Sequence, residues 1–259
     1  MPDFDTVKYA TDDNVAIVTI SRPDAMNSFN DDLRRDLHAA LEIAANDQSI
    51  RVVILTGEGR TFSAGADLKD IDTGRSIEEM LQQEYRPVFE SIGRMEKPVI
   101  AAVGGSVAGI GMSIALACDL LIMADTAFML SPFTTISLVP DGGLNWLLVN
   151  QIGYRRAFQL SIESERVGAE RCVDLGLANR TAPSDSLMKE TIAWAKAIAE
   201  RAPLSIAATK KAMRHATSGS WASTFDVEAP LQKMLRHSED SAEGVAAFLE
   251  KRKPEFKGK

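Results

Sequence analysis

The chain has 259 residues, of which 45% are hydrophobic and 25% are charged, as in a globular protein with one large domain or one domain and an appendage. A formal net charge of -7 favours neither nucleic acid nor an anionic membrane surface as a partner. No apolar run reaches the length of about 18 residues that a membrane span requires, and the N-terminal residues do not resemble a signal peptide, so we expect a cytoplasmic protein.

Predicted strands and helices alternate along the first half of the chain, and helices fill the last third. The expected strands are residues 4–10, 15–21, 51–57, 98–105 and 120–125, of which the first two form a hairpin and the others are buried apolar runs. The expected helices begin at Asn30 or Asp31 and near Ala66 to Leu68, and then cover 77–94, 106–119, 144–152, 154–163, 169–175, 184–201, 204–216, 222–237 and 239–251. This order predicts an α/β core over residues 1–195 and a helical C-terminal region over residues 196–259.

Two glycine-containing loops each leave a predicted strand and enter a predicted helix. They read SAGADL at residues 63–68 and VAGIGM at residues 107–112. Glycine lets the backbone approach a ligand closely, and a helix N-terminus presents N–H groups that have no intrahelical acceptor. The two loops could therefore direct donors at one developing oxyanion. The alternative is a pair of turns that need glycine for packing, and neither loop matches a dinucleotide or P-loop motif.

Asp141 stands almost alone as an acid in its part of the sequence. Within residues 97–162 the only other acids are Asp119 and Asp125. Asp141 lies in VPDGG, and aspartate before glycine is common in turns. The surrounding residues 138–147 are mostly apolar, and burial among them would raise the pKa of the carboxyl group above its ordinary value of about 3.9. Asp141 is therefore either a turn residue or a carboxylate suited to proton transfer near neutral pH.

Other polar residues do not form a known catalytic or metal-binding motif. Asp119 and Asp125 flank a predicted strand and are expected to be structural. The three histidines fall in predicted helices far apart in the sequence, so we predict no metal site. No Gly-x-Ser-x-Gly motif supports a serine hydrolase. Cys118 and Cys172 lie in apolar surroundings and are expected to be buried free thiols, with one disulfide as the alternative.

A series of five stretches resembles the crotonase superfamily, the enoyl-CoA hydratase/isomerase group. The stretches are NSFN, TFSAGADL, KPVIAAVGGSVAGIGMSIALACDLLIMAD, GLANR and EGVAAFLEKRKPEFKGK, and the resemblance covers about residues 5–257. It implies repeated ββα turns in a superhelical core, with a helical C-terminal region at a trimer interface. It also implies an acyl-CoA thioester as ligand, with coenzyme A as part of the substrate and no separate cofactor. The implied assembly is a homotrimer or a dimer of trimers, without nucleic-acid or membrane partners.

The resemblance also implies which residues form the site. By motif position, the thioester carbonyl oxygen would lie between the backbone N–H groups of Ala66 and Ile110. The residues that match the coenzyme A contacts of the family are Ala25, Asn27, Ala64, Ala66, Asp67, Leu68 and Lys69. The candidates for the acyl pocket are Met112, Phe133 and Trp146, and core packing is the alternative for each of them.

The chain departs from the family pattern in its acids. The hydratases that this family includes share two glutamates, which hold and split a water molecule. In this chain, Ser113 occupies the first of these positions, and Pro132 or Phe133 occupies the second. Asp141 stands where the double-bond isomerases of the family carry a single acid. The stretch 132–143 is especially similar to Δ3,Δ2-enoyl-CoA isomerases and to the epoxide isomerases of phenylacetyl-CoA breakdown.

We therefore expect an enoyl-CoA isomerase in which two N–H donors stabilise an enolate and Asp141 moves the proton. One alternative is hydration on the same scaffold with Asp141 as the only acid. Another is a non-catalytic acyl-CoA-binding protein, which a solvent-facing Asp141 would favour. RNA binding is disfavoured by the acidic charge balance and the lack of a basic stripe.

Overall fold

The computed structural model describes residues 4–70, 74 and 76–259, and the chain is built on two β-sheets. The six-stranded sheet has the order β1-β2-β3-β5-β7-β10, and the four-stranded sheet has the order β4-β6-β8-β9. The strands are β1 (Val7–Asp12), β2 (Val15–Ile20), β3 (Val52–Gly57), β4 (Thr61–Ser63), β5 (Val99–Val103), β6 (Ser106–Ala108), β7 (Leu120–Ala124), β8 (Phe128–Leu130), β9 (Val167–Gly168) and β10 (Arg180–Ala182).

Helices connect the strands and form the C-terminal part of the chain. They are α1 (Asp31–Asn46), α2 (Ile77–Met80), α3 (Arg86–Arg94), α4 (Ile110–Ala117), α5 (Leu144–Ile152), α6 (Tyr154–Glu163), α7 (Ala169–Leu175), α8 (Leu187–Ala199), α9 (Pro203–Ala216), α10 (Trp221–Arg236) and α11 (Glu239–Glu250). A π-helical turn over Leu81–Tyr85 separates α2 from α3, so the predicted helix 77–94 is not one regular α-helix.

The chain passes between the two sheets in a repeating order. In the first sheet β3, β5 and β7 pair in parallel, and in the second sheet β4, β6 and β8 pair in parallel. The strands follow one another in the pairs β3–β4, β5–β6 and β7–β8, with one strand of each pair in each sheet. Helical structure follows each pair. The predicted α/β class with repeated ββα turns is confirmed.

The three-residue strands of the second sheet were not predicted from the sequence. Residues 106–119 were expected to form one helix, but Ser106–Ala108 is strand β6 and the helix begins at Ile110. The cause is a close backbone crossing at Gly105, where a Cβ atom would lie 1.9 Å from the carbonyl oxygen of Arg60. The chain therefore leaves β5 against the start of β4 and continues as its parallel neighbour, which excludes a helix there.

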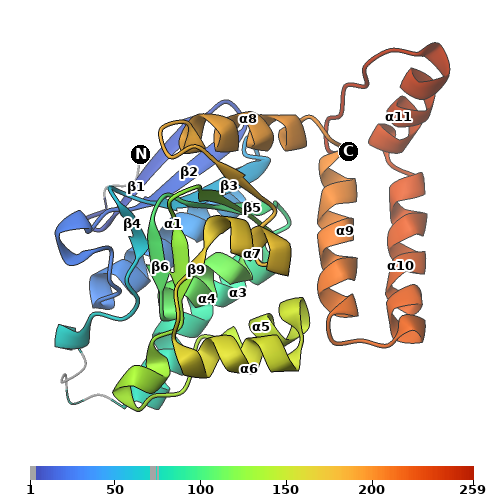
Figure 1. Cartoon of the computed structure of the whole chain (residues 1–259). Coiled ribbons are helices and arrows are strands. Elements are labelled where there is room, and N and C mark those ends of the chain that lie inside the picture. Colours follow the sequence, from blue (N-terminus) through green and yellow to red (C-terminus); the bar gives the residue numbers. More distant parts are fainter. Residues whose placement is uncertain (1–3, 71–73, 75) are drawn as a thin grey trace.

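The core lies around the six-stranded sheet, and three C-terminal helices lie to one side of it. Helix α8 packs on β2, β3, β5 and β7, and α1 packs on β1 and β2 (Figure 1). The predicted domain boundary after residue 195 thus falls inside a helix that packs on the sheet. Helices α9, α10 and α11 extend beside this core (Figure 1). Among the described residues, no helix has both the length and the apolar character of a membrane span.

Asp119 holds α9 against the core. Its Oδ2 accepts hydrogen bonds from the Val99 N–H at 2.8 Å and forms an ion pair with Lys210 Nζ at 2.7 Å, while its Oδ1 accepts from Arg214 Nη2 at 2.7 Å. The carboxylate follows the free thiol of Cys118, and burial raises the pKa of that thiol, and of the free thiol of Cys172, to about 12. Asp119 is therefore structural, as predicted, and neither cysteine is an activated thiolate.

Replacing Asp119 should loosen α9. Asp119→Ala leaves the largely buried Lys210 ammonium without its acid, and breaking a buried ion pair typically costs about 3–5 kcal/mol. We expect a loss of that order in the free energy of unfolding, measured by urea unfolding at fixed protein concentration. Asp125→Ala is the matched control, because Asp125 is exposed and its recorded partner is the Ser184 hydroxyl at 2.8 Å. Equal stability of the two variants would contradict this account of α9.

Candidate active site

The candidate site lies where three parallel strands of the second sheet end. The loops after β4, β6 and β8 begin at Ala64, Gly109 and Ser131. Because the carboxyl ends of parallel strands lie at one edge of a sheet, these loops adjoin. A Cβ atom on Gly65 would lie 3.1 Å from the Ala108 carbonyl oxygen and 3.6 Å from the Ile110 backbone nitrogen. The structure thus brings together the two glycine loops identified in the sequence.

Each of the two loops presents a backbone N–H group that has no acceptor among the described residues. Ala66 forms an isolated parallel bridge with Phe29, in which the Phe29 N–H donates to the Gly65 carbonyl at 2.8 Å and the Asp67 N–H donates to the Phe29 carbonyl at 2.9 Å. This pairing uses the groups on either side of the Ala66 N–H. Ile110 is the first residue of α4. Neither the Ala66 nor the Ile110 N–H donates to an acceptor within the described part of the chain.

The first loop differs from the sequence prediction in one respect. A helix was expected to start near Ala66, but Ala66 is held in the bridge with Phe29 and helical structure begins only at Leu68, as a 3-10 helix of three residues. A segment this short has no appreciable helix dipole. Ile110 alone therefore has its N–H at the start of an α-helix.

The segments expected to contact coenzyme A lie side by side. Ala25 ends a short 3-10 helix, and the Ala64 N–H donates to the Met26 carbonyl at 3.0 Å. The side chain of Asn27 is wholly buried: it accepts from the Arg22 N–H at 2.9 Å and donates to the Thr61 carbonyl at 2.6 Å. The amide of Asn27 therefore holds the loop in place, and a ligand would meet this loop through its neighbours.

The second of these segments, residues 64–69, contains an acid held in an ion pair and two exposed side chains. Asp67 forms an ion pair with Arg22 at 3.1 Å. Although burial favours protonation, the Lys69 N–H and the Arg22 side chain keep the pKa of Asp67 below its ordinary value, so it is a carboxylate. Leu68 and Lys69 are exposed. The segment thus offers a hydrophobic and a cationic side chain next to the Ala66 donor.

Asp141 lies against the first turn of α4. The Ser113 hydroxyl donates to the Asp141 carbonyl oxygen at 2.9 Å. A Cβ atom on the next residue, Gly142, would lie 3.0 Å from Ile110 Cγ1 and 2.8 Å from Phe89 Cζ. The sequence pattern indicates Ser113 only as the replacement of a glutamate, and the local signal of its contact is a hydroxyl inside an otherwise apolar helix. The acid and the Ile110 donor therefore belong to one small cluster.

The carboxyl group of Asp141 is poorly solvated. The residue is about half-buried, and its Oδ1 is buried without a hydrogen-bond partner among the described residues. Burial raises the pKa of Asp141 to about 6. The side chain therefore does not face open solvent. A solvent-facing side chain would instead have favoured a non-catalytic turn residue.

The remaining predicted site residues are distributed differently. Phe133 is buried, and its Cζ lies 3.9 Å from the position of a Cβ atom on Gly109. Met112 is wholly buried in the core, whereas Trp146 is 48% exposed on α5. Of these three residues, Met112 ends the loop that carries the Ile110 N–H, and Phe133 packs against that loop at Gly109.

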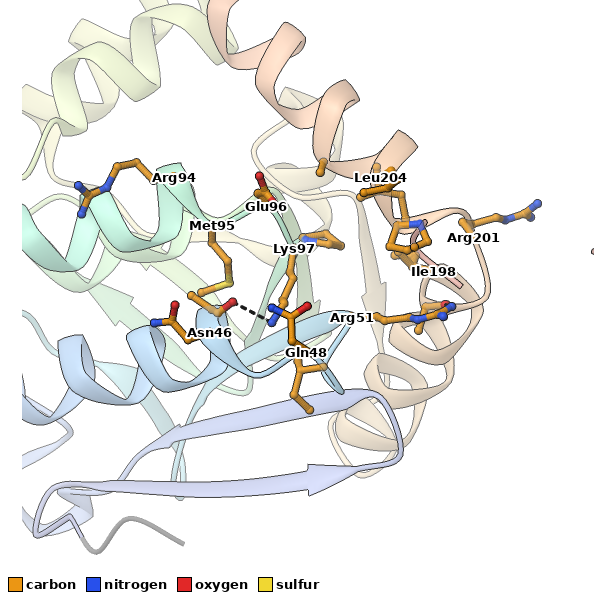
Figure 2. A pocket seen from close by; sticks show the side chains of 18 of the residues that line it. Asn46, Gln48, Arg51, Arg94, Met95, Glu96, Lys97, Ile198, Arg201 and Leu204 are labelled. Atoms are coloured by element: carbon orange, nitrogen blue, oxygen red, sulfur yellow. Dashed lines mark hydrogen bonds between the residues drawn. The ribbon is translucent and has the colours of Figure 1, made fainter. Parts of the chain in front are cut away.

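A separate cavity of about 570 Å³ lies where the core meets the C-terminal helices (Figure 2). Two of its cations hold parts of the fold together: Lys97 Nζ donates to the carbonyls of Ala44 at 2.6 Å and Asp47 at 2.6 Å, and Arg51 donates to those of Ala199 at 3.1 Å and Phe256 at 2.6 Å. These bonds cap α1 and join the core to the C-terminal segment. None of the predicted site residues lines this cavity, so the chemistry is assigned to the loop cluster.

Two N–H donors from adjoining loops and one desolvated carboxyl group beside them are the kinds of group that stabilising an oxyanion and transferring a proton require. The family profile described as Enoyl-CoA hydratase/isomerase matches residues 10–259. A "Probable enoyl-CoA hydratase" of Rhodobacter capsulatus is 38% identical over 99% of both chains. The 1,2-epoxyphenylacetyl-CoA isomerase of Escherichia coli is 34% identical over 95% of both chains. The crystal structure of an enoyl-CoA hydratase from Polaromonas superimposes with a TM-score of 0.91 at 33% identity, over 97% of this chain and 99% of the other.

The chain therefore belongs to the enoyl-CoA hydratase/isomerase family, the crotonase superfamily expected from its motifs. Its relatives carry both activities in their names, and a hydratase name accompanies the 38% identical relative. Those names do not separate the two reactions. The special similarity to the isomerases remains a prediction that rests on Asp141.

The raised pKa of Asp141 should appear in the pH dependence of stability. The folded state has a pKa of about 6 at this group, and the unfolded chain has about 3.9. The folded state binds the proton more tightly, so the contribution to stability is complete below about pH 4 and is lost as the pH rises through 6. Asp141→Asn, which cannot ionise, should exceed wild type in stability at pH 8 by up to about 3 kcal/mol, at about 1.4 kcal/mol per pKa unit.

That difference should nearly vanish at pH 4, where the carboxyl group of the folded wild type is also neutral and that of the unfolded chain is only about half ionised. Urea unfolding of both proteins at the two pH values, at one protein concentration, measures it. A difference that is the same at both pH values would show that Asp141 does not titrate with a raised pKa.

Proposed function

We propose that the protein is an enoyl-CoA isomerase that moves a double bond within the acyl chain of a coenzyme A thioester. The thioester oxygen accepts hydrogen bonds from the Ala66 and Ile110 N–H groups, which stabilise the enolate. The Asp141 carboxylate removes a proton from the carbon next to the thioester and returns it two carbons along the chain. Coenzyme A is part of the substrate, and its contacts come from the loop at Ala25 and Asn27 and from residues 64–69.

The observation that carries this proposal is the environment of Asp141. Its Oδ1 is buried without a hydrogen-bond partner in the described part of the chain, its pKa is raised to about 6, and its backbone carbonyl is held by Ser113 on the helix that begins with Ile110. A carboxyl group near neutral pKa can accept and return a proton at comparable cost, and such a positioned group contributes about 10²–10⁴ in rate. A turn aspartate would be solvated instead.

The inventory of groups supports isomerisation over hydration. Isomerisation needs one group that shuttles a proton, whereas hydration also needs a group to hold water. The two positions where hydratases of the family resemble one another in glutamate carry Ser113 and Pro132 or Phe133. The Ser113 hydroxyl already donates to the Asp141 carbonyl, and Phe133 is buried.

Hydration is the second candidate, because a relative 38% identical to this chain is named a probable enoyl-CoA hydratase. In that case Asp141 would act on a water molecule held by backbone groups. Supplying 3-enoyl-, 2-enoyl- and aryl-CoA thioesters separately, and identifying each product by mass, distinguishes the two reactions. Hydration adds the mass of water, and isomerisation leaves the mass unchanged.

Removing the carboxylate should abolish most of the turnover. Asp141→Asn keeps the volume and loses the base, so kcat for isomerisation should fall by at least about 10², the lower end for an acid–base group. Affinity for the thioester should change little, because the oxygen is held by backbone groups. In wild type, kcat/KM should fall as the pH drops below about 6, where Asp141 becomes protonated. Asp125→Asn is the control for an exposed acid on the same chain.

Wild-type kcat in a folded Asp141→Asn variant would remove Asp141 from the mechanism. A water-adduct product from wild type that depends on Asp141 would replace isomerisation with hydration.

We also propose that the active form is a homotrimer or a dimer of trimers. The support is the apolar surface of the C-terminal helices, where Trp221 and Phe248 are 81% and 83% exposed. Trp221 stacks on Phe225 with ring centroids 5.5 Å apart, and Leu249 adjoins Phe248 in the chain. Large exposed apolar patches mark interaction surfaces.

Sedimentation equilibrium at micromolar concentration should therefore give three or six times the chain mass of 28.1 kDa. A single species of one chain mass would contradict the assembly. Such a result would leave the proposed chemistry of Asp141 untouched.

A further inference from the structure

A buried arginine on α1 lies close to the candidate site. The side chain of Arg34 is 2% exposed, and it follows Leu33 on the face of α1 that packs into the core. Burying a guanidinium group is costly unless its donors are satisfied. Its neighbour Arg35 is 64% exposed and pairs with Asp32 at 2.9 Å. The two adjacent arginines thus differ sharply in environment, and the buried one requires an explanation.

The guanidinium of Arg34 joins three segments of the chain. Its Nε donates to Glu84 Oε2 at 2.7 Å, its Nη2 pairs with Asp31, and its Nη1 donates to the Phe29 carbonyl oxygen at 3.3 Å. It also lies over the ring of Tyr85, 4.9 Å from the ring centroid. These contacts use the planar fork of an arginine in several directions, which a lysine could not reproduce.

The Phe29 carbonyl is the link to the proposed oxyanion donor. The same oxygen accepts the Asp67 N–H at 2.9 Å, and the Phe29 N–H donates to the Gly65 carbonyl at 2.8 Å. A carbonyl oxygen has two lone pairs and can accept from both Asp67 and Arg34. The residue between Gly65 and Asp67 is Ala66. Arg34 therefore fixes the backbone that, in turn, fixes the Ala66 N–H.

At its other end, the network includes the π-helical turn that leads into α3, the helix that packs against the residue after Asp141. Glu84 and Tyr85 belong to the π-helical turn before α3, and π-helical turns are frequent at functional sites. The Tyr85 ring packs on Phe29 with centroids 5.9 Å apart. The next helix carries Phe89, whose Cζ lies 2.8 Å from the position of a Cβ atom on Gly142. Arg34 is thus bonded to the Phe29 segment, which pairs with the first glycine loop, and to the π-helical turn, which leads into the helix that carries Phe89.

We propose that Arg34 is a positioning residue, which aims the Ala66 N–H at the thioester oxygen by holding the Phe29 carbonyl and the π-helical turn in register. This role rests on the proposed function of the site. Arg34 does not touch the substrate. Its effect should appear in the polarisation of the bound carbonyl, a property that a merely structural arginine would leave unchanged.

The test uses the full-length protein and a saturated acyl-CoA thioester, hexanoyl-CoA, labelled with carbon-13 at the thioester carbonyl. Two N–H donors that polarise this carbonyl lower its infrared stretching frequency relative to the thioester in water. Wild type and Arg35→Met, the control for an exposed arginine on the next residue, should show the same lowering. In Arg34→Met most of the lowering should be lost. Its kcat should fall at least about 10-fold, a part of the 10²–10³ that deleting one oxyanion donor costs, with a smaller change in KM.

Circular dichroism and the oligomeric state establish that each variant is folded. A folded Arg34→Met variant with the wild-type carbonyl frequency and kcat would overturn the positioning role. If wild type itself shows no lowering, the proposed oxyanion donors are wrong and the role of Arg34 falls with them.

If Arg34→Met does not fold, Arg34→Lys provides the test. Lysine keeps a positive charge at this depth but cannot bond the Phe29 carbonyl, Glu84 and Asp31 together. It should give a partial loss of both the frequency shift and kcat. Wild-type values in the lysine variant would overturn the proposal.

Discussion

Three short strands, β4, β6 and β8, pair in parallel, and this pairing decides where every group of the candidate site can lie. Parallel strands end at a common edge, so the loops that follow them must adjoin even though 45 residues separate the β4–β6 partners Thr61 and Ser106. The bridge between Phe29 and Ala66 extends this edge by one further segment. Backbone N–H groups at such an edge are set by the fold, so replacing the side chains of the donor residues themselves disturbs them little.

The second constraint is electrostatic. The Asp141 carboxyl group is drawn out of water against α4, and its raised pKa means that ionisation costs stability at neutral pH. The fold holds the loop nonetheless, through the Ser113 hydroxyl on the Asp141 carbonyl and the tight contact of Gly142 with Ile110 and Phe89. A site that keeps a carboxyl group poorly hydrated has it ready for proton transfer, which is the basis of the proposed isomerase activity.

Much of the architecture could be predicted from the sequence because it depends on long apolar patterns. Strands such as β3 and helices such as α1 repeat one pattern over six residues or more, and both are as expected. Strands of three residues carry no periodicity, so β4, β6 and β8 were missed and residues 106–108 were assigned to a helix. The extended conformation of Ala66 depends on Phe29, which is distant in sequence, and no local pattern indicates it.

The candidate site divides in the same way. Asp141 could be singled out as a candidate because it stands nearly alone among apolar residues, and the two loops with the candidate donors could be singled out by their glycines. The Ser113 hydroxyl bond and the Arg34 network depend on contacts across 28 and 50 residues of sequence, which spacing cannot reveal. For the Arg34 network, the visible sign in the sequence is a charged residue on the apolar face of α1.

Hydrogen exchange at the reacting carbon tests the central claim most directly. With a 3-enoyl-CoA thioester in deuterated water, NMR follows the loss of the proton next to the thioester carbonyl. If Asp141 is the base and the enolate forms at the Ala66 and Ile110 donors, wild type exchanges this proton and the folded Asp141→Asn variant does not. Exchange at the wild-type rate in that variant would contradict the account, because another group would then be moving the proton.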